Sequence, residues 1–172
     1  MIDGLELPTE LAAASGTLTL RRATDDDLDE LMRLLSDDPI SAGRGDRARP
    51  EDREAYANGL RDVTTTPGND LFVAVDDSGV IGTFQLTVLP GMARRGARRM
   101  QVEAVRVASA RRSSGAGTAM MRWVSDVAAP ASGCALIQLT SDSAREDAHR
   151  FYDRLGYVAS HVGFKLSLPR AR

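Results

Sequence analysis

The sequence predicts a single α/β domain, and three observations support this class. Its 172 residues match the usual length of one domain. The apolar fraction of 42% and the charged fraction of 27% are those of a globular protein, and no window reaches the ~18 apolar residues of a membrane span. Strand-like and helix-like patterns alternate along most of the chain. We expect a leader over 1–16, the domain over 17–168 and a tail over 169–172.

The first elements are predicted from alternation and from a helix start. A short helix is expected at 8–14, and the alternating residues 17–22 predict the first strand. Thr24 precedes three aspartates, which favour the first turn of a helix because of its macrodipole. The apolar residues of 28–35 recur at helical spacing, and a polar loop is expected at 41–49.

The middle of the chain predicts one more helix and a run of strands. Pro50 and the two acidic residues after it open a helix. Residues 71–75 and 80–89 predict two strands joined by the Asp-Asp-Ser-Gly turn at 76–79. An arginine-rich loop then leads into a strand at 100–107.

The last third predicts an order of helix, strand, helix and strand. Glycines at 113–117 open the first helix, and the continuous apolar run 135–140 is typical of a strand in a parallel sheet. A helix with an apolar face covers 148–155 and stops at Gly156, and 158–168 is the last expected strand.

The stretch 101–118 has the clearest chemical pattern. A strand ends at Val107, a basic loop with Arg111 and Arg112 follows, and a Gly-Ala-Gly sequence opens a helix. Backbone N–H groups at a helix start are unpaired and carry partial positive charge, which suits a phosphate. A tight turn without a ligand is the alternative.

Two known nucleotide motifs do not fit this stretch. The third glycine of the dinucleotide fingerprint is missing, and seven residues (108–114) separate the strand from the first glycine. A P-loop ends in Gly-Lys-Ser/Thr, which is also missing here.

The stretch resembles the acetyl-CoA motif of the GNAT superfamily of N-acetyltransferases. That family has a strand ending in V-x-V, followed by Arg/Gln-x-x-Gly-x-Gly/Ala, and here Val-Arg-Val stands at 105–107 and Arg-Ser-Ser-Gly-Ala-Gly at 112–117. A second family motif, A-x-x-F-Y-x-x-L-G-F/Y, is present at 148–157. The resemblance covers 17–168 and implies a mixed, mostly antiparallel sheet of six to seven strands, with a central parallel pair splayed for CoA and about four helices.

The resemblance implies acetyl-CoA as co-substrate and no metal. The backbone of the strand would pair with pantetheine, and the amides of the helix start would hold the pyrophosphate. The implied cofactor-binding residues are Val105, Arg106, Val107, Arg112, Ser113, Ser114, Gly115, Ala116, Gly117, Thr118, Arg145 and His149. Arg145 departs from the asparagine that the family often has at this position.

The resemblance also implies the catalytic residues. Glu103 matches the position of a base acting through water, the backbone N–H of Val105 would polarise the thioester carbonyl, and Tyr152 matches the tyrosine that protonates the leaving thiolate. A solvent-exposed or ion-paired Glu103 and a purely packing Tyr152 are the alternatives.

The other reactive side chains predict little chemistry. Cys134 stands alone, which excludes an internal disulfide and favours a buried apolar role. His149 and His161 are expected at the surface, with a ligand contact as the alternative, and no metal-ligand spacing is present. The first ten residues lack the basic region of a signal peptide, so a cytoplasmic location is expected.

The net charge of −2 conceals two opposed halves. Residues 1–90 carry 18 acidic and 8 basic side chains, whereas residues 91–172 carry 6 acidic and 14 basic ones. The basic half holds both motifs and would surround the CoA phosphates. We therefore expect the acidic half, with 25–30 and 37–38, to face a cationic amine, although a solvated acidic face is the alternative.

The expected function is acetyl transfer from acetyl-CoA to a primary amine by direct attack in a ternary complex. A small amine, an aminoglycoside, an amino acid and a protein amine all remain open as acceptors, as does a homodimer; no membrane partner is expected. The alternatives are a non-catalytic acyl-CoA-binding domain and nucleic-acid binding through the four arginines of 94–99, which the acidic pI of about 5.7 disfavours.

Overall fold

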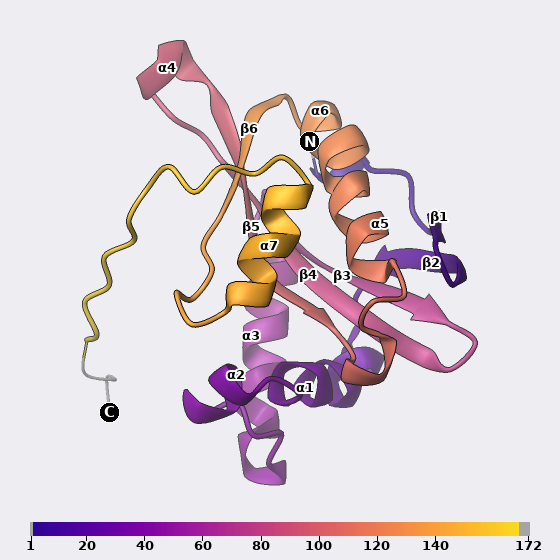
Figure 1. Cartoon of the computed structure of the whole chain (residues 1–172). Coiled ribbons are helices and arrows are strands. Elements are labelled where there is room, and N and C mark those ends of the chain that lie inside the picture. Colours follow the sequence, from indigo (N-terminus) through magenta and orange to yellow (C-terminus); the bar gives the residue numbers. More distant parts are fainter. Residues whose placement is uncertain (1, 169–172) are drawn as a thin grey trace. The chain divides into compact units, whose positions relative to one another are not determined.

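The strands of the chain form one mixed sheet (Figure 1). The computed structural model describes residues 2–168, and the sheet in this range has six strands in the order β1-β2-β3-β4-β5-β6. All neighbours are antiparallel except the parallel pair β5 and β6. The strands are β1 (Thr9–Ala13), β2 (Gly16–Arg22), β3 (Asn69–Asp76), β4 (Gly79–Leu89), β5 (Arg98–Val107) and β6 (Cys134–Leu139). The predicted α/β class with a mostly antiparallel mixed sheet is confirmed.

The start of the chain is a strand and not the predicted helix at 8–14. β1 pairs with β2 with Leu11 opposite Leu18, and both leucines are buried. The tight turn at Gly16, whose φ is +131°, allows this pairing. The alanines of β1 favour a helix intrinsically, but tertiary pairing and burial override that preference.

The predicted strand at 158–168 is also wrong, and this changes the place of the parallel pair. Residues 158–168 contain no strand in the described part of the chain. The alternating pattern alone does not make a strand, because a strand needs a hydrogen-bonding partner. β5 and β6 consequently lie at the edge of the sheet and not at its centre.

Two helices follow the predicted start signals. Thr24 and Asp27 form a capping box around the 3-10 turn η2 (Asp25–Asp27), and α1 (Leu28–Ser36) continues from it. The 3-10 turn η3 (Pro50–Asp52) opens α3 (Arg53–Thr65). The expected loop at 41–49 begins instead inside the short helix α2 (Pro39–Gly43), because Asp38 accepts a hydrogen bond from the Ser41 amide and caps it.

Short helical segments connect the later strands of the sheet. The β4–β5 hairpin carries α4 (Ala93–Gly96) at its tip and extends beyond the other strands (Figure 1). After β5 come the 3-10 turn η4 (Ser109–Arg111) and α5 (Ala116–Trp123). The π-helical segment η5 (Val124–Ala128) and α6 (Ala129–Ala131) then lead to β6.

The two faces of the sheet pack against different helices. Phe72 and Phe84 stack with ring centroids 5.2 Å apart, and both rings contact Trp123 of α5. On the other face, Val73 joins a second buried cluster with the leucines of α1 and Leu60 of α3. Side chains alternate across a strand, so β3 supplies both faces.

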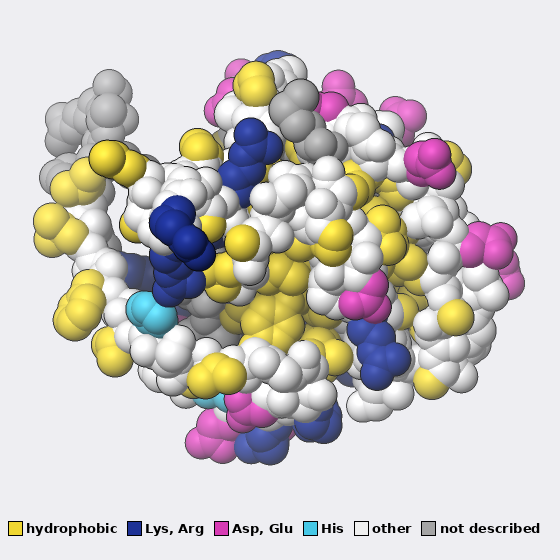
Figure 2. All heavy atoms as spheres, turned by 90° about the horizontal axis from the view of Figure 1, so that it is seen from above, with side chains coloured by type: hydrophobic (Ala, Val, Ile, Leu, Met, Phe, Trp, Pro, Cys, Tyr) yellow, Lys and Arg dark blue, Asp and Glu magenta, His cyan; other side chains and the backbone are white. Residues whose placement is uncertain are grey.

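The chain divides after Leu139, and the second unit is described by itself. Its helix α7 (Glu146–Arg154) is terminated by Gly156, which follows the C-cap Leu155 and has a φ of +86°. The amide of Gly156 donates to the Asp153 carbonyl, and the amide of Tyr157 donates to the Tyr152 carbonyl. The predicted helix and its glycine stop are therefore confirmed. The segment after it is extended, with apolar side chains spaced along it (Figure 2) and Phe164 93% exposed.

Within residues 2–168, none of the helices combines the length and the apolar character needed to cross a membrane. The predicted tail 169–172 lies outside the described residues.

Candidate functional site

The centre of the candidate site is a bulge in β5. β5 pairs with β4 through Glu103 opposite Gln85 and Arg106 opposite Thr83, so two residues, Ala104 and Val105, lie opposite one residue of β4. Ala104 has a φ of +51°, which L-residues rarely adopt. Such a bulge re-aims the side chains on either side of it.

Beyond the bulge, β5 has an open edge. Its parallel pairing with β6 ends at Val102 opposite Leu139, whereas β5 itself continues to Val107. In the described part of the chain, the edge of 103–107 that follows this pairing has no strand partner on the β6 side. Unpaired backbone groups at a strand edge can bind an extended ligand carrying amides.

The next helix, α5, starts after the 3-10 turn and loop that follow this open edge. Gly115 takes the left-handed conformation at φ +88° and stands just before α5, and Ser113 also has a positive φ of +63°. The first helical bond runs from the Ala119 amide to the Gly115 carbonyl, so the amides of 116–118 precede the hydrogen-bonded turn. The glycine is required, because a Cβ at Gly115 would lie 2.7 Å from the backbone nitrogen of Ala14.

The loop between strand and helix is fixed by hydrogen bonds. The amide of Ser109 donates to a carboxylate oxygen of Asp37 at 2.6 Å, and Arg112 donates to the Asp37 carbonyl at 3.2 Å. Arg111 forms an ion pair with Asp76 at 2.9 Å, and this pair contributes to holding the pKa of Asp76 below its usual value after the larger effect of the Ser78 hydroxyl. Arg111 therefore anchors the β3–β4 turn, while Arg112 lies beside the helix start.

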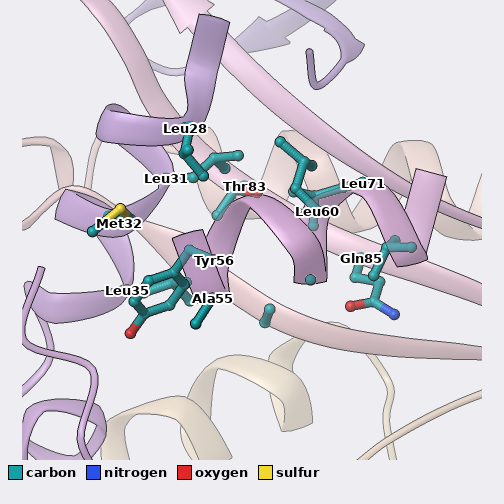
Figure 3. Close-up of a pocket in the computed structure, with 13 residues that line it drawn as sticks. Leu28, Leu31, Met32, Leu35, Ala55, Tyr56, Leu60, Leu71, Thr83 and Gln85 are labelled. Carbon is teal, nitrogen blue, oxygen red and sulfur yellow. The ribbon is translucent and has the colours of Figure 1, made fainter. Parts of the chain in front are cut away.

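A cavity of about 250 Å³ lies on the sheet face that carries α1 and α3 (Figure 3). From α1 it is lined by Leu28, Leu31, Met32 and Leu35. From α3 it is lined by Ala55, Tyr56, Gly59, Leu60 and Val63. From the sheet it is lined by Leu71, Thr83, Gln85 and the bulge residue Ala104. The cavity therefore reaches the point where β5 loses its partner.

The polar side chains of the cavity wall differ in whether they form hydrogen bonds within the protein. Thr83 donates its hydroxyl to the Phe72 carbonyl at 2.8 Å, and Tyr56 donates to Asp46 at 2.7 Å. Burial and the Asp46 carboxylate raise the pKa of Tyr56 to about 12, so its hydroxyl stays protonated. Gln85 is the one polar side chain of the described lining for which no hydrogen bond forms within residues 2–168.

Glu103 lies next to this cavity, and the bulge separates it from the alternating pattern of Val105 and Val107. Because it is in register with Gln85, its side chain is on the same face of the sheet as the Gln85 amide. The carboxylate is exposed to solvent. In a strand without a bulge, strict alternation would place Glu103 on the same face as Val105 and Val107, and the bulge breaks this alternation.

Arg106 lies on the same side as Glu103. One guanidinium nitrogen donates to the Val105 carbonyl at 2.8 Å and another to the Ser41 hydroxyl at 2.6 Å. The side chain thus links β5 to α2.

The remaining predicted site residues belong to the second unit. The ring of Tyr152 packs edge-on against Phe151 and Tyr157, with centroids 5.2 and 5.6 Å away. The ring nitrogen Nε2 of His149 lies 2.9 Å from the Asp142 carbonyl, and Arg145 precedes the first residue of α7. The structure brings these three together on one short segment.

Two other side chains behave as surface or packing residues. Burial raises the pKa of the Cys134 thiol, which disfavours the reactive thiolate. His161 is exposed and its Nδ1 lies 2.8 Å from the Ser160 hydroxyl.

Sequence reasoning did not identify the cavity residues as a site. The apolar residues of 28–35 predicted a helix face but not a cavity, and neither Gly59 nor Gln85 stands out in the sequence. Both positions become informative only when α3 and the β4–β5 pair are placed together.

The sequence profile described as "Acetyltransferase (GNAT) family" matches residues 28–157. No curated protein matches the chain. A solved structure of a transcriptional regulator from Bacillus halodurans C-125 is 35% identical, with a TM-score of 0.82 over 88% of this chain and 99% of that one. An Agrobacterium tumefaciens str. C58 protein assigned as an acetyltransferase is 26% identical, with a TM-score of 0.72 over 87% of this chain and 99% of that one.

A third structure shows the fold at low identity. Glucosamine-6-phosphate N-acetyltransferase from Arabidopsis thaliana is 15% identical, with a TM-score of 0.67 over 88% of this chain and 99% of that one. The chain belongs to the GNAT acetyltransferase family. The family resemblance inferred from the two motifs is confirmed.

Proposed function

We propose that the protein transfers the acetyl group of acetyl-CoA to a primary amine by direct attack in a ternary complex. The observation that carries this proposal is the continuity of three features along one segment. The bulge at Ala104, the open edge to Val107 and the helix start after Gly115 follow one another within residues 104–118. The family assignment supports acetyl transfer as the reaction class.

The residues of this segment fit an acetyl-CoA molecule. The open edge of β5 offers backbone groups to the two amides of pantetheine. The Ala116 amide donates to the Ser114 hydroxyl at 3.3 Å, so the amides of Gly117 and Thr118 are the donors that the helix start offers to a pyrophosphate, and the guanidinium of Arg112 adds positive charge beside them. When bound, acetyl-CoA supplies an acetyl group activated as a thioester.

The chain's own groups then manage charge and protons. Val105 lies in the bulge without a register partner on β4 or β6, and its N–H would polarise the acetyl carbonyl. Glu103 would accept a proton from the attacking amine, directly or through water, and Tyr152 would donate one to the departing sulfur.

The reaction balances with these two proton transfers. The amine nitrogen bonds to the acetyl carbon, and the carbon–sulfur bond breaks with its electron pair going to sulfur. The amine loses one proton to Glu103, and the thiolate gains one from Tyr152.

Acetyl-CoA binding and thiol release test the proposal together. At about 100 times the Kd, acetyl-CoA should stabilise the fold by about 2.7 kcal/mol in a thermal shift measurement. Glu103→Gln and Tyr152→Phe should each lower kcat/KM by ~10²–10⁴-fold if the proton transfer limits the rate. Unaltered kcat/KM and pH profiles in both variants would contradict the assigned roles.

A non-catalytic acyl-CoA-binding domain gives a different result in the same experiment. Stabilisation by acetyl-CoA without thiol release for any amine would favour it over the enzyme. A lack of stabilisation by saturating acetyl-CoA or CoA would overturn both.

The exposed arginines of the β4–β5 hairpin favour nucleic-acid binding as a second candidate. Arg94, Arg95 and Arg98 are exposed and form no ion pair within residues 2–168, and the Bacillus halodurans relative is a transcriptional regulator. Binding to phosphates would weaken steeply with salt. Undetectable DNA binding would exclude this second function. DNA binding that does not depend on salt and does not change when these arginines are replaced with serine would exclude it as well.

A further inference from the structure

We infer that the acceptor is a monoamine with a small apolar body, bound with that body in the cavity between α1, α3 and the sheet and with its nitrogen beside Gln85 at the β5 bulge. This inference rests on the proposed function and specifies its substrate class.

The cavity lies beside the β5 bulge. Ala104, at the bulge, belongs to its wall, and the exposed Glu103 is in register with the lining residue Gln85. An amine at this end lies next to the backbone of Val105, where the acetyl carbonyl is expected. An acceptor elsewhere on this face of the sheet would have to reach the same point from outside the cavity.

The wall of the cavity is mostly apolar. Nine of the lining side chains come from the two helices, and these are aliphatic apart from Gly59 and the ring of Tyr56. None of the described lining residues is acidic. A second ammonium group placed inside would lose its hydration without gaining a counter-ion, which is strongly unfavourable. The wall therefore selects an apolar body and rejects polycations such as polyamines and aminoglycosides.

The acidic residues at the start of α1 are paired within the chain. Asp27 pairs with Arg21 at 2.7 Å, Asp29 with Arg53 at 2.9 Å and Glu30 with Arg33 at 2.6 Å. Their charges are therefore already compensated, so these three residues provide no unpaired carboxylates to bind a polycationic acceptor.

Gln85 is the polar side chain of the wall that has no hydrogen-bond partner in the described part of the protein. Figure 3 shows Gln85 at one end of the lining residues, with Met32, Leu35 and Tyr56 at the other. The amide oxygen of Gln85 accepts hydrogen bonds, whereas the hydroxyls of Thr83 and Tyr56 are already held by donating to the Phe72 carbonyl and to Asp46. The amine is therefore oriented toward Gln85, and the apolar body points away from the bulge.

The size of the cavity limits the body. A cavity of ~150 Å³ is enough for benzene, and this one measures about 250 Å³. It accommodates an aromatic ring or a branched aliphatic group on a short chain. Phenethylamine and isoamylamine are suitable probes, whereas ethylamine leaves the space empty and spermidine carries extra charges.

Gly59 offers a direct way to fill the cavity. It lines the space from α3, its side-chain position meets no atom within 4 Å, and its φ is not in the left-handed range. Gly59→Leu therefore adds an aliphatic side chain to the cavity without backbone strain. Ala55→Leu, one turn earlier on α3, is a second filling variant. Asn58, like Gly59 and Ala55, is exposed but does not line the cavity, so Asn58→Leu adds the same side chain outside it as a control.

The experiment compares thiol release for phenethylamine, isoamylamine, ethylamine and spermidine in the parent and these variants. We expect Gly59→Leu and Ala55→Leu to lower kcat/KM for phenethylamine by ~10–200-fold. The same two variants should change kcat/KM for ethylamine by less than about 3-fold. Asn58→Leu should leave kcat/KM unchanged for both amines. Gln85→Leu should lower kcat/KM for all amines alike. Binding of a fluorinated phenethylamine, followed by ¹⁹F NMR, should disappear in Gly59→Leu without any need for turnover.

The outcomes separate this inference from the proposed function. Preferred acetylation of spermidine, or equal losses for phenethylamine and ethylamine in both filling variants, would overturn the apolar acceptor while leaving the enzyme intact. Absence of thiol release with all amines would refute the proposed function. In that case, ¹⁹F-detected binding lost in Gly59→Leu would still support the cavity as an amine site, and absence of binding in the parent would overturn that as well.

Discussion

The two faces of the central sheet differ in how they are filled. Under α5, Phe72, Phe84 and Trp123 bring three aromatic rings into mutual contact, and both phenylalanines are fully buried. Under α1 and α3, leucines cover the sheet but leave a cavity of about 250 Å³. The same strands supply both faces through alternating residues, so one residue set can stabilise the fold while the other leaves room for a ligand.

The two faces also differ in the space around a glycine. On the α5 face, Gly82 of β4 has no side chain, and a Cβ there would lie 2.9 Å from the sulfur of Met120. On the other face, a Cβ at Gly59 would meet no atom within 4 Å. One glycine permits close packing, and the other leaves space.

The largest expected effect comes from removing an aromatic ring on the α5 face. Phe84→Ala should lower the free energy of unfolding by about 3–5 kcal/mol, because it deletes a fully buried ring from a filled cluster. Leu31→Ala, at the cavity, should cost about 2–3 kcal/mol, at the low end of the usual range, because Leu31 borders space that is already open. Chemical denaturation measures both, and a greater loss for Leu31→Ala would contradict the contrast between the faces.

A somewhat smaller effect is expected where the cavity face is fixed to the sheet. Asp27 is buried and accepts two hydrogen bonds of 2.7 Å from Arg21 and one of 2.8 Å from the Thr24 amide. Asp27→Asn should lower the free energy of unfolding by about 1.5–3 kcal/mol at neutral pH, the range for hydrogen bonds to a charged group.

The same pair predicts a pH dependence. The hydrogen bonds from Arg21 lower the pKa of Asp27 in the folded protein relative to the unfolded chain. Its stabilisation is therefore complete above the ordinary aspartate pKa of ~3.9 and is lost as the pH falls through the lower folded value. Denaturation curves between about pH 2 and 6 should show a shallower acid limb for Asp27→Asn, and parallel curves would refute this origin.

Elements that depend on interactions between residues close in sequence were predicted correctly, and elements that depend on distant residues were not. The helix start at Thr24 and the glycine stop of α7 depend on residues within four positions, and both were predicted. β1 and the segment 158–168 depend on a distant strand, and in both cases the local pattern was misleading. Alternation shows that a segment suits a strand, but the pairing partner decides whether it becomes one.

The candidate site divides in the same way. The glycine-rich helix start after β5 is a local motif, and the structure has the left-handed Gly115 where the motif requires it. The cavity depends on the register that sets Gln85 opposite Glu103 and on the distance between α3 and the sheet. Neither quantity can be obtained from a spacing of residues along one segment.

Gly115 connects the α5 face to the proposed cofactor site, and its substitution gives a moderate effect. In Gly115→Ala, the new Cβ would lie 2.7 Å from the Ala14 nitrogen and the backbone would remain at φ +88°. We expect a loss of about 2 kcal/mol in the free energy of unfolding, the usual cost of overpacking, and weaker binding of acetyl-CoA.

Gly79→Ala is a matched control for Gly115→Ala, because Gly79 also has a positive φ, of +106°, but its side-chain position is open. It shares the conformational cost without the clash at the helix start. Isothermal titration with acetyl-CoA distinguishes the two, and equal affinities in both variants would separate Gly115 from the cofactor site.

The smallest expected effect is on the cavity wall itself. Tyr56→Phe removes the hydroxyl that donates to Asp46 but keeps the ring, so it should cost only about 0.5–1.5 kcal/mol, the value of a typical hydrogen bond. Because burial and Asp46 raise the pKa of Tyr56 to about 12 in the folded protein, this contribution is complete below the unfolded value of ~10 and is lost as the pH rises toward 12. The difference between parent and variant ultraviolet titrations at 295 nm isolates this tyrosine from the other two. A difference titration with a midpoint near 10 would mean that the Tyr56 hydroxyl is neither buried nor bonded to Asp46, and Tyr56 would then not be part of the apolar wall on which the choice of a monoamine depends.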